Sequence, residues 1–503
     1  MRYRERLNAA YRAVGRVTAS ILILLGFIHL VPLLVLLPFP HESAAATAFI
    51  IPAVTGIILG LILWVLFRRA DVTILTLRDG VLITFLVWTI ACCLGAVPYH
   101  LQGLGWRNAL FESVSGWSTT GLTVVDVTRA SPLILFWRAF QQLLGGAGLI
   151  LVMSSALAGP WATGLYQAEG HGEPLLPHIG RSTRAILGIY LGYTLLGVGA
   201  FLIAGLPLFE SILHSMTALA TGGFSTQPGS LGDFHSISVE GVAIVLMALG
   251  QLNFLLHFLI LRGKWRTVLK HGEPRLFIGA LLIAVPLLYF GAARSLWGME
   301  WGIRRALFQA VSALSGTGFS IAPDAEWNSL GAAVIIGLML IGGGVNSSAG
   351  ALKQHRVYLI LKSMVWQIRR FFLPRSAVFV RQIWKGEERV VLEAEHLQGV
   401  AGYVILYLFA WSMGSIILMG YGTGMQAALF EFASALGGVG LTVGVTRPDA
   451  PGGILWTEMI GMFLGRLEFF VVILALGKMI IDFREFARFG INPKAPPKLA
   501  QED

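Results

Sequence analysis

Four short stretches of the sequence carry glycine beside threonine or serine in the same order, a combination that could bind a dehydrated cation. In each stretch the glycine is followed by Leu or Phe and then by Thr or Ser; the glycines are Gly121, Gly223, Gly318 and Gly440. Consecutive backbone carbonyls can face one axis only if some residue adopts a positive φ, which glycine does without steric cost. Stacked rings of carbonyl oxygens replace the water shell of K⁺. The residue types therefore favour ion conduction.

We predict that each stretch contributes four residues to a selectivity filter, with transported K⁺ as the metal bound there. The predicted residues are Thr119, Thr120, Gly121, Leu122, Thr221, Gly222, Gly223, Phe224, Gly316, Thr317, Gly318, Phe319, Gly438, Val439, Gly440 and Leu441. Threonine and serine hydroxyls could add oxygen ligands. Each glycine taken singly could instead pack helices or form a turn. The agreement of all four in register favours the filter.

The stretches end four half-length apolar segments that align without a gap: 112–123, 214–225, 309–320 and 431–442. Each segment lies between two long apolar runs. A segment of about ten apolar residues is too short to cross a bilayer. It can enter and turn back where its backbone is buried in protein or lines water. We therefore predict four re-entrant pore loops.

The predicted fold is an all-α polytopic membrane protein with four pseudo-symmetric helix–pore loop–helix repeats around a central pore, plus two N-terminal transmembrane helices near 17–37 and 48–67. The long runs of the repeats lie near 80–98 and 133–158, 184–206 and 240–262, 276–292 and 330–361, and 398–420 and 454–482. The predicted domains are an N-terminal two-helix domain, 1–75, and the repeats 76–165, 180–270, 275–365 and 395–490.

Composition and charge agree with a membrane location. Of 503 residues, 55% are hydrophobic and 13% are charged, whereas soluble domains carry about a quarter charged residues. The net charge of +10 comes from basic residues in alternate connections between the apolar runs, which marks the cytoplasmic side rather than nucleic-acid binding. We expect a multi-pass protein in the lipid bilayer with both termini in the cytoplasm.

Two other function classes fit less well. No nucleophile–His–acid cluster, His-Glu-x-x-His motif or Walker loop indicates an enzyme. Coupled carriers often bury carboxylates at the middle of the membrane, and the long runs hold few, such as Glu468. A continuous pore is the better hypothesis.

Some polar residues in apolar surroundings have two interpretations. Glu112 and Glu431 begin aligned pore segments, where an acid suits a helix N-terminus or could attract cations; the structural role is favoured. Asn253 and His257 lie one helical turn apart. They could hold a metal, but two ligands make a poor site, so a structural polar pair is favoured.

The filter motifs resemble those of the Trk/Ktr/HKT cation transporter superfamily, closest to its branch of TrkH-type bacterial potassium uptake subunits. The resemblance also rests on the segments 145–148, 252–258 and 465–469. It implies a homodimer in the bacterial cytoplasmic (inner) membrane above a cytosolic, TrkA-like regulatory ring that binds nucleotides, with no cofactor bound covalently to this chain. In this family, glycine at all four filter positions goes with K⁺ selectivity and serine in the first repeat with Na⁺ permeation. Gly121 thus favours K⁺ uptake; a Na⁺-permeable or weakly selective transporter is the alternative.

The resemblance also implies a gate on the cytoplasmic side of the filter. A Gly/Ser-rich break at 342–353 should unwind the second helix of repeat three, which is tolerable beside a water-filled cavity, although a plain kink is the alternative. In the family this loop obstructs the pore, and a charge at the position of Arg466 repels cations; Arg466 could instead pair with Glu468 or reach the interface. The predicted gate residues are Gly343, Gly344, Asn346, Ser347, Ser348, Gly350, Lys353 and Arg466.

Overall fold

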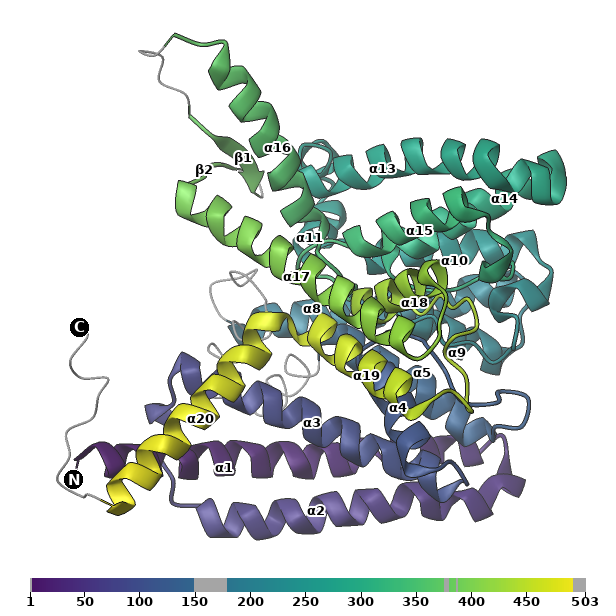
Figure 1. The fold of residues 1–503 in the computed structure, drawn as a ribbon. Coiled ribbons are helices and arrows are strands. Elements are labelled where there is room, and N and C mark those ends of the chain that lie inside the picture. The colour runs from purple at the N-terminus through teal and green to yellow at the C-terminus, as the bar shows by residue number, and fades with distance from the viewer. Residues whose placement is uncertain (1, 149–178, 375–379, 386–387, 492–503) are drawn as a thin grey trace. The chain divides into compact units, whose positions relative to one another are not determined.

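The computed structural model describes residues 2–148, 179–374, 380–385 and 388–491, and nearly all regular structure in these residues is helical (Figure 1). Six helices are long and apolar enough to cross a membrane, or up to eight spans if each of two bent helix pairs counts as one. This count covers only the described residues. The all-α class expected from the sequence is confirmed.

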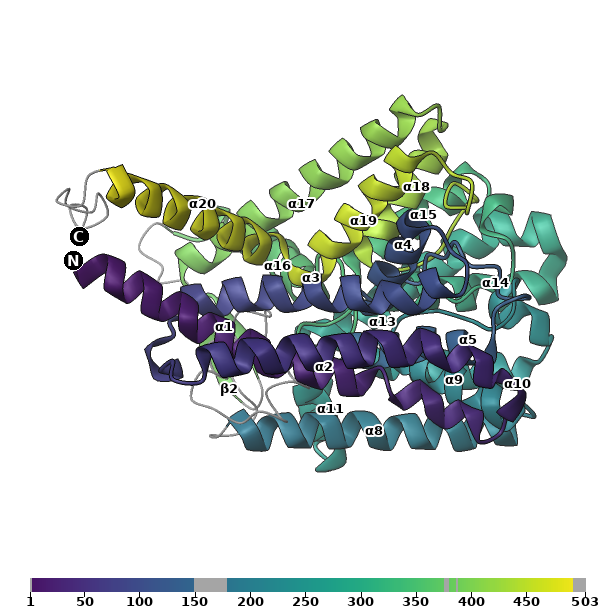
Figure 2. The same cartoon turned by 90° about the horizontal axis from the view of Figure 1, so that it is seen from below.

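The chain divides into two compact units, and the first comprises Met1–Leu110, Gly148–Ala185 and Leu467–Asp503. Its helices and 3₁₀ turns are α1 (Arg2–Ile28), η1 (Val31–Leu36), η2 (Pro40–Ala46), α2 (Thr47–Phe67), η3 (Val72–Ile74), α3 (Leu77–Leu101) and α20 (Phe469–Ile491). Helices α1 and α2 lie side by side in both views (Figures 1 and 2). A Cβ added to Gly26 would lie 2.7 Å from the carbonyl oxygen of Ala53, so a small residue permits this close packing.

The second unit comprises Phe111–Ala147 and Ile186–Arg466 and contains all four glycine stretches. Two helices begin in the first unit and continue into the second: α4 (Trp106–Trp117) and α8 (Ile179–Ile203). The remaining elements are α5 (Pro132–Ala147), α9 (Leu208–Leu219), η4 (Ser230–Phe234), α10 (Ile237–Gly250), α11 (Phe254–Leu261), α12 (Trp265–Val268), α13 (Gly272–Leu288), the π-helical turn η5 (Tyr289–Ala293), α14 (Arg294–Ser315), η6 (Asp324–Glu326), α15 (Ser329–Ile341), α16 (Gln354–Phe371), β1 (Gln382–Lys385), β2 (Glu388–Val391), α17 (Ala394–Gly420), α18 (Met425–Gly437) and α19 (Gly452–Leu467).

Several apolar runs predicted as single spans are divided. The second run of repeat two breaks between α10 and α11, whose axes differ by 108°. The run 454–482 breaks at Glu468, which has a positive φ of 59°. The break at 342–353 was expected, and it separates α15 from α16. The run 133–158 is helical to Ala147, and its part beyond residue 148 lies outside the described residues.

A short antiparallel hairpin was not foreseen. Strands β1 and β2 pair with Gln382 opposite Val391 and Lys385 opposite Glu388. They lie in the basic connection between α16 and α17, where the sequence shows charge more clearly than strand periodicity.

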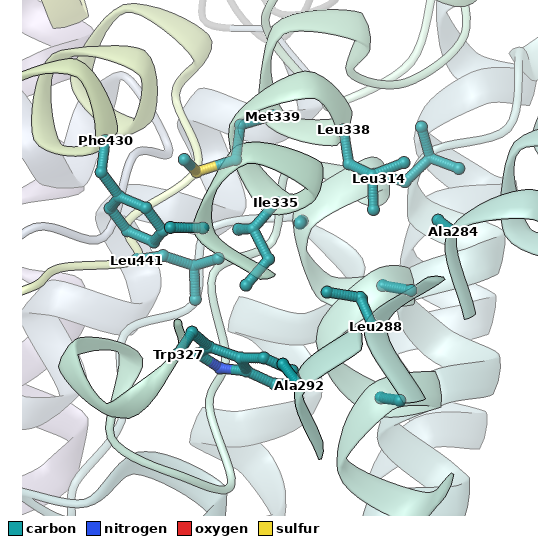
Figure 3. Packing of buried hydrophobic residues seen from close by; sticks show 14 of the residues in the cluster. Ala284, Leu288, Ala292, Leu314, Trp327, Ile335, Leu338, Met339, Phe430 and Leu441 are labelled. Atoms are coloured by element: carbon teal, nitrogen blue, oxygen red, sulfur yellow. The ribbon is translucent and has the colours of Figure 1, made fainter. Parts of the chain in front are cut away.

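A buried apolar cluster fixes the end of the fourth glycine stretch. Leu288, Trp327, Ile335 and Phe430 are at most 3% exposed, and they pack together with Leu441, which directly follows Gly440 (Figure 3). The cluster therefore joins α13, α15 and α18 to the backbone of a glycine stretch.

Candidate functional site

All four stretches begin with the same unusual backbone conformation. The residue two positions before each glycine has a positive φ: 57° at Thr119, 50° at Thr221, 71° at Gly316 and 64° at Gly438. For β-branched threonine this conformation is a genuine outlier. The Thr119 and Thr221 hydroxyls donate to the carbonyls of Ser118 and Ala220, each at 2.7 Å. Strain of this kind concentrates at functional sites.

The four glycines form a closed ring, because each lies against a backbone carbonyl of the next repeat. Their φ values are 93°, 72°, 82° and 95° in chain order. A Cβ added to any of them would collide with a carbonyl oxygen. The distance from the added Cβ would be 2.2 Å to Gly222 O for Gly121, 2.1 Å to Thr317 O for Gly223, 1.8 Å to Val439 O for Gly318, and 2.2 Å to Thr120 O for Gly440. The contacts run from repeat one to two, three, four and back to one. Both the backbone angle and the spacing therefore require glycine.

Serines of the pore helices hold the ring to the helices before it. Ser115 Oγ accepts from the Gly121 amide at 3.1 Å, and Ser434 Oγ accepts from the Gly440 amide at 2.9 Å. In repeat three, Ser312 Oγ donates to the Phe319 carbonyl at 2.6 Å. These bonds fix the direction of the backbone in the predicted filter.

The first residue of each aligned segment bonds to the chain beyond the ring. Glu112 accepts from the Thr123 hydroxyl at 2.9 Å, and Glu431 accepts from the Thr442 hydroxyl at 2.6 Å. His214 Nε2 and Ser225 Oγ are 3.0 Å apart, whereas Gln309 Nε2 donates to Asp324 Oδ1 at 2.5 Å. All four side chains are buried. Glu112 and Glu431 lie in the middle of α4 and α18, so their predicted place at a helix N-terminus is wrong. Their structural role is instead to accept hydrogen bonds from the chain that follows the ring.

Arg138 and Gln142 join repeats one and two, and the sequence reasoning missed both. Arg138 donates to Glu112 at 2.7 Å and to the Ser225 carbonyl at 3.0 Å. Gln142 Nε2 donates to the Gly222 carbonyl at 2.6 Å, and its Oε1 accepts from the Phe224 amide at 3.1 Å. Arg138 is a charge within an apolar run, the same signal that singled out Arg466.

A cavity of about 600 Å³ opens where the stretches end, and all four filter glycines line it. Its other lining residues include Asp126, Asp324, and the ion-paired Arg304 and Glu240. Hydrogen bonds from the Thr128 hydroxyl and amide lower the pKa of Asp126. Burial raises the pKa of Asp324. One exposed carboxyl group and one buried carboxyl group thus line this cavity.

At the other end of the stretches lies the segment between α15 and α16. A Cβ added to Gly350 would lie 2.5 Å from the Gly437 carbonyl oxygen, and one added to Gly316 would lie 3.6 Å from Ala349 Cβ. The segment 342–353 therefore packs against residues just before the filter glycines, which brings the predicted gate loop to the predicted filter.

Side chains from two helices, and one from the loop itself, hold this loop. Arg466 donates to the Ser348 carbonyl at 2.7 Å and to the Gly145 carbonyl. Lys353 Nζ donates to the Ala349 carbonyl. The buried Glu273, at the start of α13, accepts from the Val345 amide at 2.8 Å.

The loop also completes the broken helix of repeat two. The Gly344 amide donates to the Gln251 carbonyl at 2.9 Å, and the Phe254 amide donates to the Asn346 carbonyl at 3.2 Å. Two interrupted helices thus satisfy each other's free backbone groups, as buried non-helical backbone requires. Sequence reasoning found one break but neither the other nor the role of Glu273.

Asn253 and His257 act separately. Asn253 Oδ1 accepts from the Leu255 amide at 2.9 Å and caps α11. His257 Nε2 lies 3.0 Å from the Leu249 carbonyl oxygen. Within the described part of the chain, no group of three or more His, Cys, Asp or Glu side chains is placed to hold a metal ion.

Comparisons with known proteins agree over most of the chain. The family profile described as "TrkH: Cation transport protein" matches residues 45–271 and 301–482. A cation transporter of Methanocaldococcus jannaschii is 29% identical over 91% of this chain and 93% of its own length. The Trk system potassium uptake protein TrkH of Escherichia coli is 28% identical over 92% of this chain and 98% of its own.

A solved structure is also similar. The crystal structure of the potassium transporter TrkH from Vibrio parahaemolyticus superposes with a TM-score of 0.81 at 28% identity, covering 93% of this chain and 98% of that one.

Proposed function

Because the chain belongs to the TrkH family of cation transport proteins, we propose that it takes up K⁺ across the cytoplasmic membrane through the glycine ring. Relatives that match this chain over nearly their whole length are named potassium uptake proteins. Permeation is passive and is driven by the membrane potential. The four quarters 76–165, 180–270, 275–365 and 395–490 act as the pore repeats, and 1–75 as an N-terminal two-helix domain.

The observation that carries this proposal is the contact of each filter glycine with a carbonyl of the next repeat. This contact brings the backbones of all four repeats together, and stacked backbone carbonyls can replace the water shell of K⁺. Glycine at Gly121 favours K⁺. The alternative function is a Na⁺-permeable or weakly selective transporter. Replacing Gly121 by serine distinguishes the two functions through the ratio of K⁺ to Na⁺ flux.

The gate in this proposal is the loop 342–353 with Arg466. The loop lies against the pre-filter residues, and Arg466 bonds to it through Ser348. While the loop stays in this position, its backbone and the guanidinium charge oppose cation passage. Opening requires the loop to leave Arg466 and Glu273.

The functional assembly we propose is a homodimer in the inner membrane with both termini in the cytoplasm. A TrkA-like ring beneath it binds the regulatory nucleotide and moves the gate. The name "Trk system" of several relatives supports a membrane subunit that works with other components.

The test is growth at low external K⁺ of a strain that lacks K⁺ uptake, with the chain and its regulatory partner expressed together. We expect restored growth, and a shift towards Na⁺ flux in Gly121→Ser. No rescue by protein shown to be in the membrane would contradict K⁺ uptake. An unchanged K⁺/Na⁺ flux ratio in Gly121→Ser would contradict the filter assignment in repeat one.

A further inference from the structure

Helices α5 and α19 pack against their pore helices in the same way. A Cβ added to Gly145 of α5 would lie 2.0 Å from the Trp117 carbonyl oxygen, and one added to Gly465 of α19 would lie 2.0 Å from the Leu436 carbonyl oxygen. Trp117 and Leu436 occupy the same column of the aligned segments. Positions in α5 and α19 can therefore be compared directly.

This comparison places Glu458 where repeat one has Arg138. Arg138 precedes Gly145 by the same number of residues as Glu458 precedes Gly465. In repeat one the guanidinium neutralises Glu112, with Nε 2.7 Å from Oε1. In repeat four the partner of Glu431, which aligns with Glu112, is a second carboxyl group instead of a cation.

A single hydroxyl lies between these two carboxyl groups. Thr446 Oγ1 is 2.5 Å from Glu431 Oε1 and 3.2 Å from Glu458 Oε2. Glu431 also accepts from the amides of Thr446 and Val443, at 2.9 and 3.0 Å. Glu431 therefore only accepts hydrogen bonds, as an ionised carboxylate does. The Thr446 hydroxyl has a single proton, and Glu431 accepts it. No proton of Thr446 is left for Glu458.

Glu458 is completely buried, and its Oε1 has no hydrogen-bond partner among the residues that the structure describes. An isolated buried carboxylate would be very costly, so such a group takes up a proton instead. A further charged group beside the pair is itself acidic, because Asp324 interacts with Glu431. No cluster there is placed to hold a metal ion among those residues.

We propose that Glu458 is a proton-binding residue, whose carboxyl O–H donates to Thr446 Oγ1 while the Thr446 hydroxyl donates to Glu431. The proton comes from water and returns to it, and only O–H bonds form or break. Its release would leave two buried anions on either side of one hydroxyl. Their repulsion would loosen Thr446 and the segment that follows Gly440, so the wall of the ring in repeat four depends on this proton.

Infrared spectroscopy of the purified full chain tests the proton without measuring transport. We expect a C=O stretching band of a protonated carboxyl group that shifts in D₂O, is lost in Glu458→Gln, and changes frequency in Thr446→Val. The matched control Asp449→Asn removes an exposed carboxylate of the same connection and should leave the band unchanged. A wild-type band unaffected by both Glu458→Gln and Thr446→Val would overturn the proposal.

Stability provides a second readout. An unfolded glutamate loses its proton above about pH 4.3, whereas the folded chain keeps the proton of Glu458, so stability should fall as pH rises. We expect the unfolding temperature to decline above about pH 4.3 until Glu458 ionises in the folded chain, and to decline less steeply in Glu458→Gln. An equal slope in both proteins would contradict the proposal. If Glu458→Gln does not fold, the wild-type band and Thr446→Val test the proposal. The band should then disappear at alkaline pH in the wild type and change frequency in Thr446→Val, and the absence of both changes would contradict the proposal. A normal band without K⁺ flux would contradict the proposed function alone.

Discussion

At the filter glycines, two constraints act on the same residue. The backbone has a positive φ, and a neighbouring carbonyl oxygen fills the space where a Cβ would project. The first constraint alone is moderate, since alanine at positive φ costs about 1 kcal/mol. The second cannot be relieved by a rotamer change, because the neighbouring atom belongs to the backbone of another repeat.

Gly318→Ala should abolish cation flux. Its Cβ would lie 1.8 Å from the Val439 carbonyl oxygen, so the ring must open or collapse. The control is Gly422→Ala, because Gly422 has a φ of 88° with nothing near an added Cβ. We expect a similar cost of about 1 kcal/mol for the angle in both. Rubidium uptake into proteoliposomes should fall in Gly318→Ala only; comparable fluxes in the two variants would contradict the ring.

Sequence reasoning identified the residues at which the local backbone conformation requires glycine. It did not identify the residues whose role depends on their tertiary partners. The glycine of each stretch repeats at a fixed place because only glycine meets the local geometry. The contacts of Arg138, Glu273 and Glu458 depend on which helices meet. A charge inside an apolar run marks such residues as important, but it does not name the partner.

At the scale of elements, the breaks in the helices are paired. The loop after α15 fills the gap between α10 and α11 through the Gly344 and Phe254 amides. Apolar periodicity cannot reveal such a pairing, because each run is long enough to be read as one span. The break at 342–353 was visible only because glycine and serine are concentrated there, and Gln251 gives no comparable signal.

Arg466→Gln should raise the basal flux of the chain measured without the proposed regulatory ring. The change removes the guanidinium bond to Ser348, and hydrogen bonds to charged groups are worth about 1.5–3 kcal/mol. That corresponds to at least about a tenfold shift towards the released loop. Arg447→Gln, at an exposed arginine of the same repeat, is the control. Unchanged rubidium flux in Arg466→Gln would show that this contact does not hold the gate.

Glu273→Ala should release the same loop from its other side. The Val345 amide would lose its acceptor, and an unsatisfied buried donor costs about 1–3 kcal/mol. We expect faster amide hydrogen exchange at 343–347 and a higher basal flux, whereas Glu300→Ala, at an exposed position of α14, should change neither. Normal exchange protection in Glu273→Ala would rule out this support.

At the scale of the whole molecule, the ring is made by residues far apart in sequence, so an ion bound in it should stabilise the entire second unit. A ligand that binds only the folded state stabilises it by about 2.7 kcal/mol at 100 times its dissociation constant. The ordering of cations by stabilisation then reports selectivity without a flux measurement.

We expect the unfolding temperature of the purified chain to rise with K⁺ or Rb⁺ more than with Na⁺ or Li⁺ at constant ionic strength. We expect the carbonyls of the proposed filter to bind the larger ions better, and Gly121→Ser should reduce the difference. Differential scanning fluorimetry across a concentration series measures the effect. Equal unfolding temperatures in all four chlorides would argue against a K⁺-selective ring.

The contact between Gly440 and the Thr120 carbonyl has a consequence for biosynthesis. It joins the last quarter of the chain to the first, so three quarters already inserted in the bilayer still leave an open-sided groove. We therefore expect the proposed pore to form only after repeat four has been inserted and has packed against repeat one.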